Sequence, residues 1–317
     1  MARTVILGAG GFIGRALAAR LTSDGTPAIA VTRRPAAIAP GLAATAVGDI
    51  TASTDWRPIL EGAASLVHLA SRAHQPAEAA APADWIEAEA AAAGHLATSA
   101  AQAGLRQVVL VSSVKAHGEA TYGVPIRAEQ PLAPADPYGL AKARIEAAMT
   151  RALQGTGTAL AIVRPPLVYG AGVRANFLTL LRLIRRAPAL PFAGIANKRS
   201  LVYRETLVDL LAHILDRPAP VRGAYLVRDG EDLSTPELVR RIGRQLGRTP
   251  VLLPCPRWAL RLGARAVGQG AALGRLTESL QLDDGATRRA LSWAPPFTID
   301  EGLAATCRWF LEKDAPH

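Results

Sequence analysis

The 317-residue chain has few cysteines and no long hydrophobic run. Its two cysteines, Cys255 and Cys307, exclude a disulfide scaffold and a cysteine-rich metal site, so we expect no bound metal. No stretch of eighteen or more residues is both apolar and uncharged, and we therefore expect no transmembrane segment. The N-terminal residues lack the apolar core and cleavage site of a signal peptide, so we expect a cytoplasmic protein.

Acidic residues are scarce in the second half of the chain. Residues 1–150 carry 12 basic and 12 acidic side chains, whereas residues 151–317 carry 24 basic and 14 acidic ones, so the whole net charge of +10 lies there. A basic half is typical of nucleic-acid binding, but no nucleic-acid-binding motif accompanies it. We therefore expect no nucleic-acid partner; a small anionic ligand, or an arginine-rich composition alone, explains the charge at least as well.

Lysine and asparagine are also rare. Only four lysines stand against 32 arginines, and two of them, Lys115 and Lys142, fall inside motifs. The only asparagines are Asn176 and Asn197.

Short apolar runs alternate with helical patterns through the first half of the chain. The expected strands are residues 3–7, 27–32, 65–70, 107–113 and 158–166, and helices are expected at 84–104 and 136–154. Strands that alternate with helices predict an α/β fold with a doubly wound parallel sheet of Rossmann type. Because the runs are continuously apolar, we expect the sheet to be buried on both faces.

The sequence pattern changes after about residue 170, where expected helices at 176–187 and 235–247 are separated by stretches rich in proline and glycine. No linker divides the chain. We expect residues 1–170 to form a dinucleotide-binding core, with some later elements returning to it, and residues 171–317 to form a smaller, interleaved substrate-binding region. The arginine-rich residues 257–265, with Trp258, either cover the substrate cleft or lie on a membrane surface.

A glycine-rich turn opens the chain between the first strand and the first helix. Gly8, Gly11 and Gly14 permit a tight turn, close approach of the backbone to a pyrophosphate, and close packing of helix on strand. The helix N-terminus that follows, with Phe12 and Ile13, offers N–H donors to phosphate oxygens. We interpret this turn as a dinucleotide site; a plain tight turn is the alternative.

The acidic residue that usually holds the cofactor ribose after the second strand is missing, and Arg33 and Arg34 stand there instead. An arginine at this place can bind a 2′-phosphate, which slightly favours NADP over NAD without excluding NAD. The alternative is a solvated surface pair. Asp49 and Ile50 end the expected third strand, where the aspartate either meets the adenine amine or is an ordinary loop residue.

Tyr138 and Lys142 lie four residues apart on the expected helix 136–154 and therefore share one helix face. A tyrosine hydroxyl is a poor base at neutral pH, but an adjacent ammonium and the positive nicotinamide favour the phenolate. Tyr138 is therefore a candidate proton acceptor when hydride leaves a carbinol carbon. Tyr-x-x-x-Lys is a weak motif alone, because such pairs occur by chance.

Two serines end the strand at 107–113. The carboxyl ends of strands face the ligand crevice of a doubly wound sheet, so Ser112 or Ser113 can hydrogen-bond a substrate oxygen beside Tyr138. A strand-end cap is the alternative.

Together these motifs, in this order and followed by RPPLVYG at 164–170, closely resemble the extended short-chain dehydrogenases/reductases. The resemblance covers essentially the whole chain and is strongest to the NAD-dependent epimerase/dehydratase branch. The segments SSVKAHGE (112–119), GVRANF (172–177) and KRSLVY (198–203) look like those of UDP-glucose 4-epimerase-like proteins and UDP-N-acetylhexosamine 4-ketoreductases of surface-polysaccharide synthesis.

The resemblance implies a role for each matching residue. Ser113, Tyr138 and Lys142 match the catalytic serine, tyrosine and lysine, and Ser113 is chosen because it lies five residues before Gly118. Leu69, Ala70 and Pro165 match positions that line the cofactor. Asn176 and Arg199 match residues that bind the substrate phosphates, where a charge-assisted arginine contact is physically apt. A loop cap or a surface charge is the alternative for the last two.

Two further departures accompany the missing ribose acid. His117 replaces a tyrosine that the family often has, and Lys115 is also unusual; both either face the sugar or are solvated loop residues. The family's asparagine near residue 90, which supports a proton relay, is absent, and Glu89 lies near its place.

The sequence thus predicts an enzyme that moves hydride between C4 of a UDP-hexose and NAD or NADP, as a C4 epimerase or a 4-ketoreductase. The arginine pair tilts the prediction slightly toward a reductase that uses external NAD(P)H. The alternative is a catalytically quiet dinucleotide-binding regulator on the same fold. The resemblance also implies a homodimer that pairs the helices at 84–104 and 136–154.

Overall fold

The computed structural model describes residues 3–36, 38–70, 82–256, 258–260, 274 and 276–313. A seven-stranded sheet with the strand order β10-β6-β5-β4-β1-β2-β3 forms the larger half, and every neighbouring pair in it is parallel. Its strands are β1 (Arg3–Leu7), β2 (Ala28–Thr32), β3 (Ala43–Ala46), β4 (Ala63–His68), β5 (Gln107–Val111), β6 (Ala159–Arg164) and β10 (Gly223–Leu226). The predicted doubly wound parallel sheet is confirmed.

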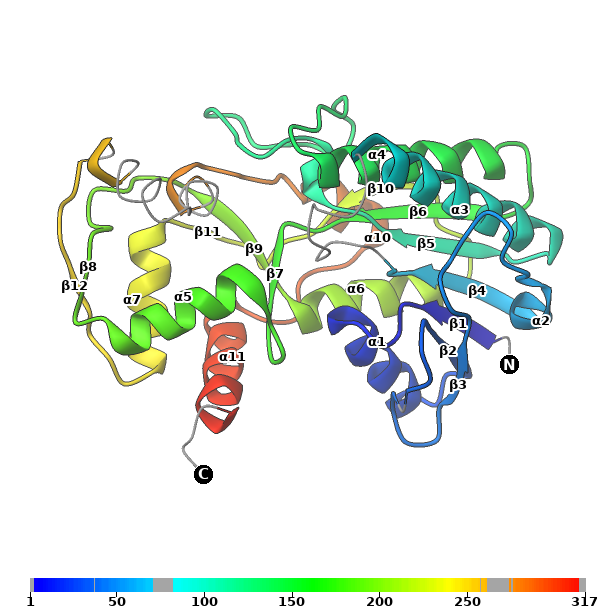
Figure 1. Cartoon of the computed structure of the whole chain (residues 1–317), viewed down its shortest axis with the longest axis horizontal. Coiled ribbons are helices and arrows are strands. Elements are labelled where there is room, and N and C mark those ends of the chain that lie inside the picture. The colour runs from blue at the N-terminus through cyan, green and yellow to red at the C-terminus, as the bar shows by residue number, and fades with distance from the viewer. Residues whose placement is uncertain are drawn as a thin grey trace.

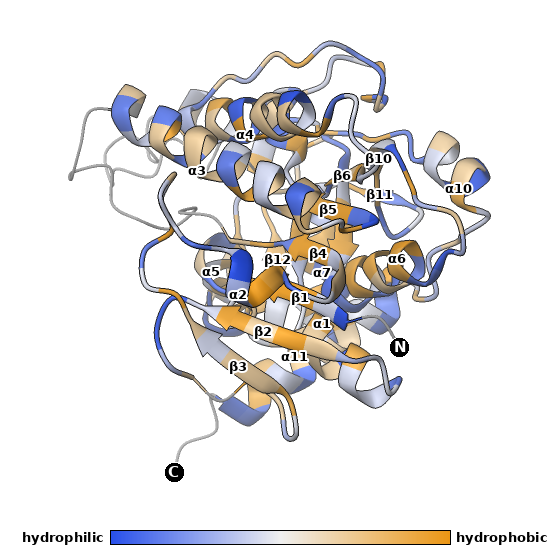
Figure 2. Ribbon diagram, turned by 90° about the vertical axis from the view of Figure 1, so that its right-hand side faces the viewer, coloured by the Kyte–Doolittle hydropathy of each residue, from blue (hydrophilic) through white to orange (hydrophobic). Residues whose placement is uncertain are grey.

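Helices cover both faces of this sheet (Figure 1). The helices α3 (Pro82–Gln102) and α4 (Pro137–Leu153) pack together on one face, and α1 (Phe12–Ser23) and α6 (Arg204–Asp216) pack together on the other. A short α2 (Arg57–Leu60) and a 3-10 turn η1 (Val114–Ala116) complete this half. The hydrophobic colour concentrates in strands such as β1, β2 and β4 (Figure 2), as burial on both faces requires.

A smaller lobe lies beyond the sheet, on the left of Figure 1. It contains a three-stranded sheet of order β11-β9-β7 and a two-stranded sheet of β12 and β8. Its elements are β7 (Leu167–Tyr169), α5 (Ala175–Arg186), β8 (Ala189–Leu190), β9 (Arg199–Tyr203), β11 (Asp232–Leu233), α7 (Thr235–Gln245), β12 (Val251–Leu252) and α11 (Ile299–Lys313). A hydrophobic core of its own joins α5, α7 and α11.

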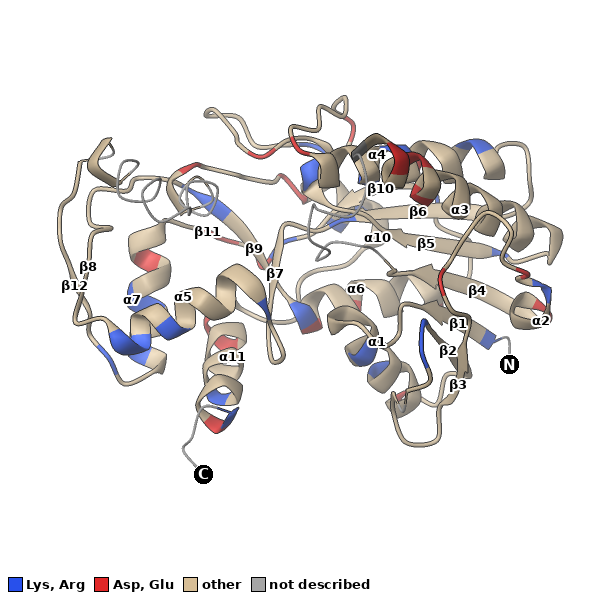
Figure 3. Ribbon diagram, in the orientation of Figure 1, with Lys and Arg blue, Asp and Glu red and all other residues tan. Residues whose placement is uncertain are grey.

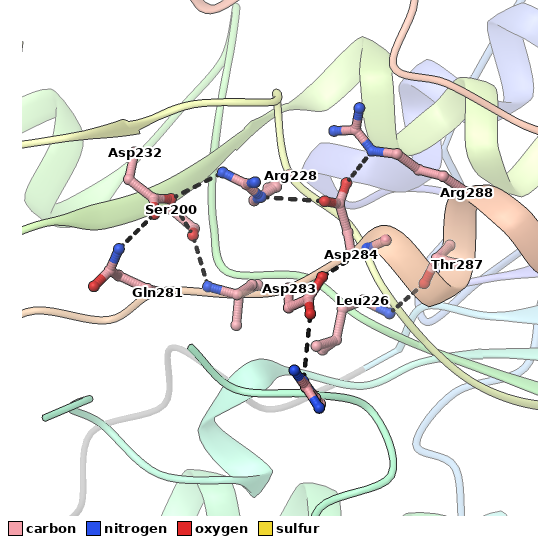
Figure 4. A network of polar contacts seen from close by, with 12 residues as sticks. Ser200, Leu226, Arg228, Asp232, Gln281, Asp283, Asp284, Thr287 and Arg288 are labelled. Atoms are coloured by element: carbon pink, nitrogen blue, oxygen red, sulfur yellow. Dashed lines mark hydrogen bonds and ion pairs between the residues drawn. The ribbon is translucent and has the colours of Figure 1, made fainter. Parts of the chain in front are cut away.

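The chain crosses between the two halves several times. After β9, α6 and β10 return to the large sheet, and β11 and α7 then go back to the lobe. A network of charged side chains braces these crossings, together with α10 (Gly285–Leu291) (Figure 4). In it, the buried carboxylate of Asp284 binds Arg228 Nε at 3.2 Å and Arg288 Nε at 2.8 Å, and Arg228 also reaches Asp232 at 3.3 Å.

Positive charge gathers in the lobe. The chain has no acidic residue between Glu146 and Glu205 or between Glu237 and Glu278. The first of these stretches contains α5, and the second begins within α7, directly after Glu237. The two helices pack against each other and carry several basic residues, blue in Figure 3. The excess of positive charge in the second half of the sequence therefore has a defined place in the fold.

Where the sequence predicts an element, the structure has one close to the expected bounds, except at the third strand. This strand ends at Ala46 rather than at Ile50, and all four of its residues are exposed because it is the edge of the sheet. Later elements such as α6, β10 and α11 have no predicted counterpart. Most of the segment 257–265 lies outside the described residues. Within the described part of the chain, no helix is long and apolar enough to cross a bilayer.

Candidate active site

The order of the strands reverses between β1 and β4, and the carboxyl ends of these two strands border the crevice where doubly wound sheets bind ligands. Gly8 follows β1, and Leu69 and Ala70 follow β4. The two chain segments touch: a Cβ placed on Gly8 would lie 2.7 Å from the backbone nitrogen of Ala70. The three predicted residues therefore meet at the switch point of the sheet.

The glycine-rich turn is closed by its own backbone. Gly8 has φ 87°, in the left-handed region, and its carbonyl oxygen accepts a hydrogen bond from Gly11 N at 3.0 Å. Gly14 is buried in the first turn of α1, where a Cβ would overlap the Gly8 carbonyl oxygen. The helix can therefore begin directly beneath the turn only because both positions are glycine, and this leaves the N-terminus of α1 open to an anion.

Gly14→Ala is expected to weaken dinucleotide binding at least about tenfold, since the methyl group must push the turn out of the geometry that cradles a pyrophosphate. Gly10→Ala in the same turn is the matched control, because its Cβ would meet nothing closer than 3.6 Å. Titration of each purified variant with NAD, followed by protein fluorescence, measures the two affinities. Equal affinities would contradict the role assigned to Gly14.

Phe12 and Ile13 begin α1 and are partly buried. The guanidinium of Arg204 lies 5.2 Å from the centre of the Phe12 ring and also binds the Ala171 carbonyl oxygen. Arg204, at the start of α6, thus ties the glycine-rich turn to the loop that leads into the lobe. No motif marks Arg204 in the sequence, and only the fold brings it to Phe12.

The end of β2 carries Arg33 and Arg34, both exposed. Backbone hydrogen bonds from Val47 and Gly48 to Thr32 and Arg33 hold the segment after β3 beside this strand end. Arg33 Nη1 lies 3.8 Å from Asp49 Oδ1, with both side chains more than half exposed. Asp49 is thus a loop residue beside the arginine pair, and Ile50 is the partly buried residue that follows it.

Tyr138 and Lys142 occupy the first turns of α4. Asp136 caps this helix by accepting a hydrogen bond from Gly139 N at 2.6 Å, and Pro137 occupies its first position. Lys142 is 3% exposed and donates to the Val111 carbonyl oxygen at 3.2 Å. Its ammonium lies 5.8 Å from the centre of the half-buried Tyr138 ring.

Burial lowers the pKa of the Lys142 ammonium to about 8, against the attraction of the Glu89 and Glu146 carboxylates. The Glu89 carboxylate therefore acts on Lys142 from α3, near the place where the resemblance led us to expect an asparagine. An ammonium with these neighbours, one helical turn from a phenol, is the arrangement that favours a phenolate.

Ser113 follows β5 and caps η1, and its Oγ accepts a hydrogen bond from Lys115 N at 3.2 Å. Val114 N donates to the Pro165 carbonyl oxygen at 3.0 Å, which holds this loop against the end of β6. The hydroxyl of Ser112 is buried and has no hydrogen-bond partner within the described residues. Ser112, Ser113 and Pro165 thus lie together at the carboxyl edge of the sheet.

Lys115 and His117 do not extend as free side chains toward an open cleft. Lys115 Nζ binds Glu119 Oε1 at 2.5 Å and also binds Asp136. His117 is 8% exposed, and its Nε2 lies 2.8 Å from Arg164 Nη1. Burial and the charge of Arg164 lower the pKa of His117. Both side chains are therefore held by neighbouring protein groups at this edge of the sheet.

A buried ion pair joins α4 to the end of β6. Arg164, immediately before Pro165, binds the Glu146 carboxylate through Nε at 3.0 Å and Nη2 at 2.7 Å. Both side chains are less than a tenth exposed. Glu146 lies one turn after Lys142, so this pair fixes the helix that carries Tyr138 and Lys142 to the strand beneath it.

The two residues expected to bind substrate phosphates lie in the lobe. Asn176 is exposed near the start of α5, directly after Ala175, whose φ of 51° turns the chain into the helix. Arg199 begins β9, and its Nη1 donates to the Glu278 carbonyl oxygen at 2.9 Å. Among the described residues, no group of three or more His, Cys, Asp or Glu side chains is arranged to hold a metal ion.

Comparison with known proteins gives concordant results. The model of the NAD dependent epimerase/dehydratase family matches residues 4–227. A UDP-glucose 4-epimerase of Vibrio cholerae is 36% identical over 319 residues, which cover 99% of this chain and 97% of that protein. A second UDP-glucose 4-epimerase, of Mycolicibacterium smegmatis, is 27% identical and covers 98% of this chain and 99% of that protein.

Solved structures share the fold. The UDP-N-acetylglucosamine 4-epimerase from Bacillus cereus has a TM-score of 0.78 at 16% identity, and the alignment covers 99% of this chain and 100% of that one. The structure of MoeE5 in complex with UDP-glucuronic acid and NAD has a TM-score of 0.77 at 20% identity, with 99% and 100% covered. At these identities the likeness establishes the architecture alone.

Proposed function

This chain belongs to the NAD dependent epimerase/dehydratase family, and from that premise we propose that it moves hydride between C4 of a UDP-hexose and a nicotinamide cofactor. The observation that carries the proposal is the Tyr138 ring 5.8 Å from the buried Lys142 ammonium, at the sheet edge that also holds Ser113. The Vibrio cholerae relative favours C4 epimerisation over ketoreduction. The proposed sugar is a UDP-hexose, including its N-acetyl or 4-keto-6-deoxy derivatives, for surface-polysaccharide synthesis.

The residues at the switch point fit a dinucleotide. At Gly8 and Gly14 a Cβ would overlap neighbouring backbone, so only glycine lets the turn close tightly against the end of β4 and the start of α1. The dinucleotide, when bound, accepts a hydride from carbon and returns it. We propose that the glycine turn with Phe12 and Ile13 holds its pyrophosphate, that Arg33, Arg34, Asp49 and Ile50 border its adenosine, and that Leu69, Ala70 and Pro165 line its nicotinamide end.

We assign the proton chemistry to Tyr138. Its phenolate oxygen takes the proton of the C4 hydroxyl as the C4–H bond breaks, and the phenol returns that proton when the carbonyl is reduced. Lys142 favours the phenolate by its charge and binds the cofactor ribose. Ser113 donates a hydrogen bond to the substrate oxygen, while Asn176 and Arg199 hold the diphosphate from the lobe.

The cofactor is NAD or NADP, and the exposed pair Arg33 and Arg34 favours acceptance of the 2′-phosphate. We also propose that the chain forms a homodimer through α3 and α4. The sequences of both helices are rich in alanine, which permits close packing.

Incubation with UDP-glucose, with UDP-N-acetylglucosamine and with a UDP-4-keto-6-deoxy sugar tests the proposal, with and without added NADH or NADPH. We expect one of the first two sugars to convert into its C4 epimer without added cofactor, detected by chromatography of the nucleotide sugars. Stoichiometric consumption of NADH or NADPH with the keto sugar would identify a reductase instead. Turnover of none of the three would refute the proposed function.

A further inference from the structure

Lys115 connects the segment after β5, which carries Ser113, to the start of α4, which carries Tyr138. Its Nζ contacts Asp136, which caps the helix of Tyr138, and Glu119, which follows the loop of Ser113. The ammonium also lies 6.0 Å from the centre of the Tyr138 ring. About a quarter of each of the Lys115 and Asp136 side chains is exposed, so water screens this contact only in part.

The backbone of Lys115 makes the connection tighter. Its N–H donates to Ser113 Oγ at 3.2 Å, and its carbonyl oxygen lies against Gly139, where any Cβ would overlap it. One residue therefore touches Ser113 through its backbone and the first turn of α4 through both its backbone and its side chain.

We propose that Lys115 is a positioning residue that fixes Ser113 and Tyr138 relative to each other and neutralises the carboxylates of Glu119 and Asp136 beside the Tyr138 ring. This assignment rests on the proposed function and extends it. It replaces the expectation that Lys115 binds the sugar.

The hydrogen bond from Lys115 N restrains the Ser113 hydroxyl. A hydroxyl has a single proton, and here one lone pair of Oγ is already occupied by the N–H of Lys115. The hydroxyl proton takes no part in this bond. Ser113 can therefore donate it to the substrate oxygen, while Tyr138 takes or returns the reacting proton.

The charge of Lys115 acts on the phenolate. Asp136 is held as a carboxylate: burial raises its pKa, but the hydrogen bonds from Lys115 and Gly139 N outweigh burial and leave the pKa below its usual value. Without Lys115, the carboxylates of Asp136 and Glu119 would be uncompensated near the ring and would disfavour a further negative charge on the phenol oxygen.

Other charged groups face the same helix turn and belong to any account of its pH dependence. They are Lys142 and Glu146 on α4, Glu89 on α3, and His68 at the end of β4, whose pKa burial and the Lys142 charge lower to about 3. None of these is altered by a change at Lys115, so the Lys115 variants isolate its own contribution.

Lys115→Met tests the proposal, with Lys115→Arg as the conservative variant and Lys313→Met as a matched control at the exposed end of α11. We expect Lys115→Met to lower kcat about 10- to 100-fold with little change in KM, because a small misplacement of reacting groups carries such a cost. The acidic limb of its pH–rate profile should move up by about 0.5 to 1 pH unit. Arginine should restore most of both, and Lys313→Met should change neither.

Glu119→Gln should have the opposite effect. It removes a negative charge and should therefore move the acidic limb of the pH–rate profile to lower pH. A second measurement does not depend on turnover. The near-ultraviolet absorbance of tyrosinate is recorded against pH, and the same titration of Tyr138→Phe is subtracted to leave the signal of Tyr138. The midpoint of that difference titration should rise in Lys115→Met and fall in Glu119→Gln.

Midpoints that do not move in opposite directions, or a kcat of Lys115→Met equal to that of the wild type, would overturn the proposal. A rise in KM alone would also overturn it and would return Lys115 to the sugar site. If no sugar is turned over but the tyrosinate midpoints of the two variants still move in opposite directions, the proposed function is refuted. The effect of Lys115 and Glu119 on the charge of Tyr138 is then retained.

Discussion

Tyr138→Phe is expected to reduce turnover of the UDP-sugar by about 10²- to 10⁴-fold, the usual contribution of a positioned acid–base group. The phenyl ring keeps its place beside Lys142, so the dinucleotide should bind with nearly unchanged affinity. Steady-state turnover and a dinucleotide titration on the same protein measure the two effects. Tyr122→Phe is the matched control, because Tyr122 is 92% exposed.

The same variant separates an enzyme from a catalytically quiet regulator on this fold. A regulator would lose nothing when the phenolic oxygen is removed, because only the ring and the backbone would contribute to binding. An unchanged turnover in Tyr138→Phe would therefore move the proton chemistry to another residue, and a wild type without turnover would favour the regulator.

Glu146→Ala is expected to lower the free energy of unfolding by about 3–5 kcal/mol, because it leaves the buried guanidinium of Arg164 without its carboxylate. Loss of this pair also frees α4 from β6, so we expect kcat to fall with stability. The shift of the urea midpoint at constant slope measures the change in stability.

Asp55→Ala is the matched control for this prediction. Asp55 and Arg57 form an ion pair of similar length, 3.1 Å, but both side chains are more than half exposed. Water and salt screen an exposed pair, so the control should leave the urea midpoint nearly unchanged. Equal shifts in the two variants would show that burial of the Arg164 pair does not determine its contribution.

The sequence contains enough information to predict the large sheet and the turn at its first strand. Its strands are continuous apolar runs, and its helices end at glycines or begin with caps, so local preference and tertiary packing agree. The two edge strands are the exceptions. The four-residue run of β10 is too short to predict a strand. The AATA sequence of β3 is exposed and carries no apolar pattern, so the predicted end of this strand at Ile50 lies four residues after the observed one.

The candidate catalytic residues could be named from the sequence because they lie in short motifs, but their partners could not. Asp136 is 21 residues from Lys115, and Arg164 is 18 residues from Glu146. Pairings over such distances depend on how α4 is laid across the sheet, which periodicity does not encode. The same reason explains why Arg204 and its contact with Phe12 were missed.

The return of α6 and β10 to the large sheet has a consequence for biosynthesis. When the ribosome has released only residues up to about 170, β6 is still an edge strand without β10 as its neighbour. The side of α1 that packs on α6 is then exposed to solvent. The half that contains the large sheet therefore cannot finish folding before residue 226 has emerged, although most of its chain precedes the lobe. A gene fragment that stops after RPPLVYG should yield aggregates rather than a minimal nucleotide carrier.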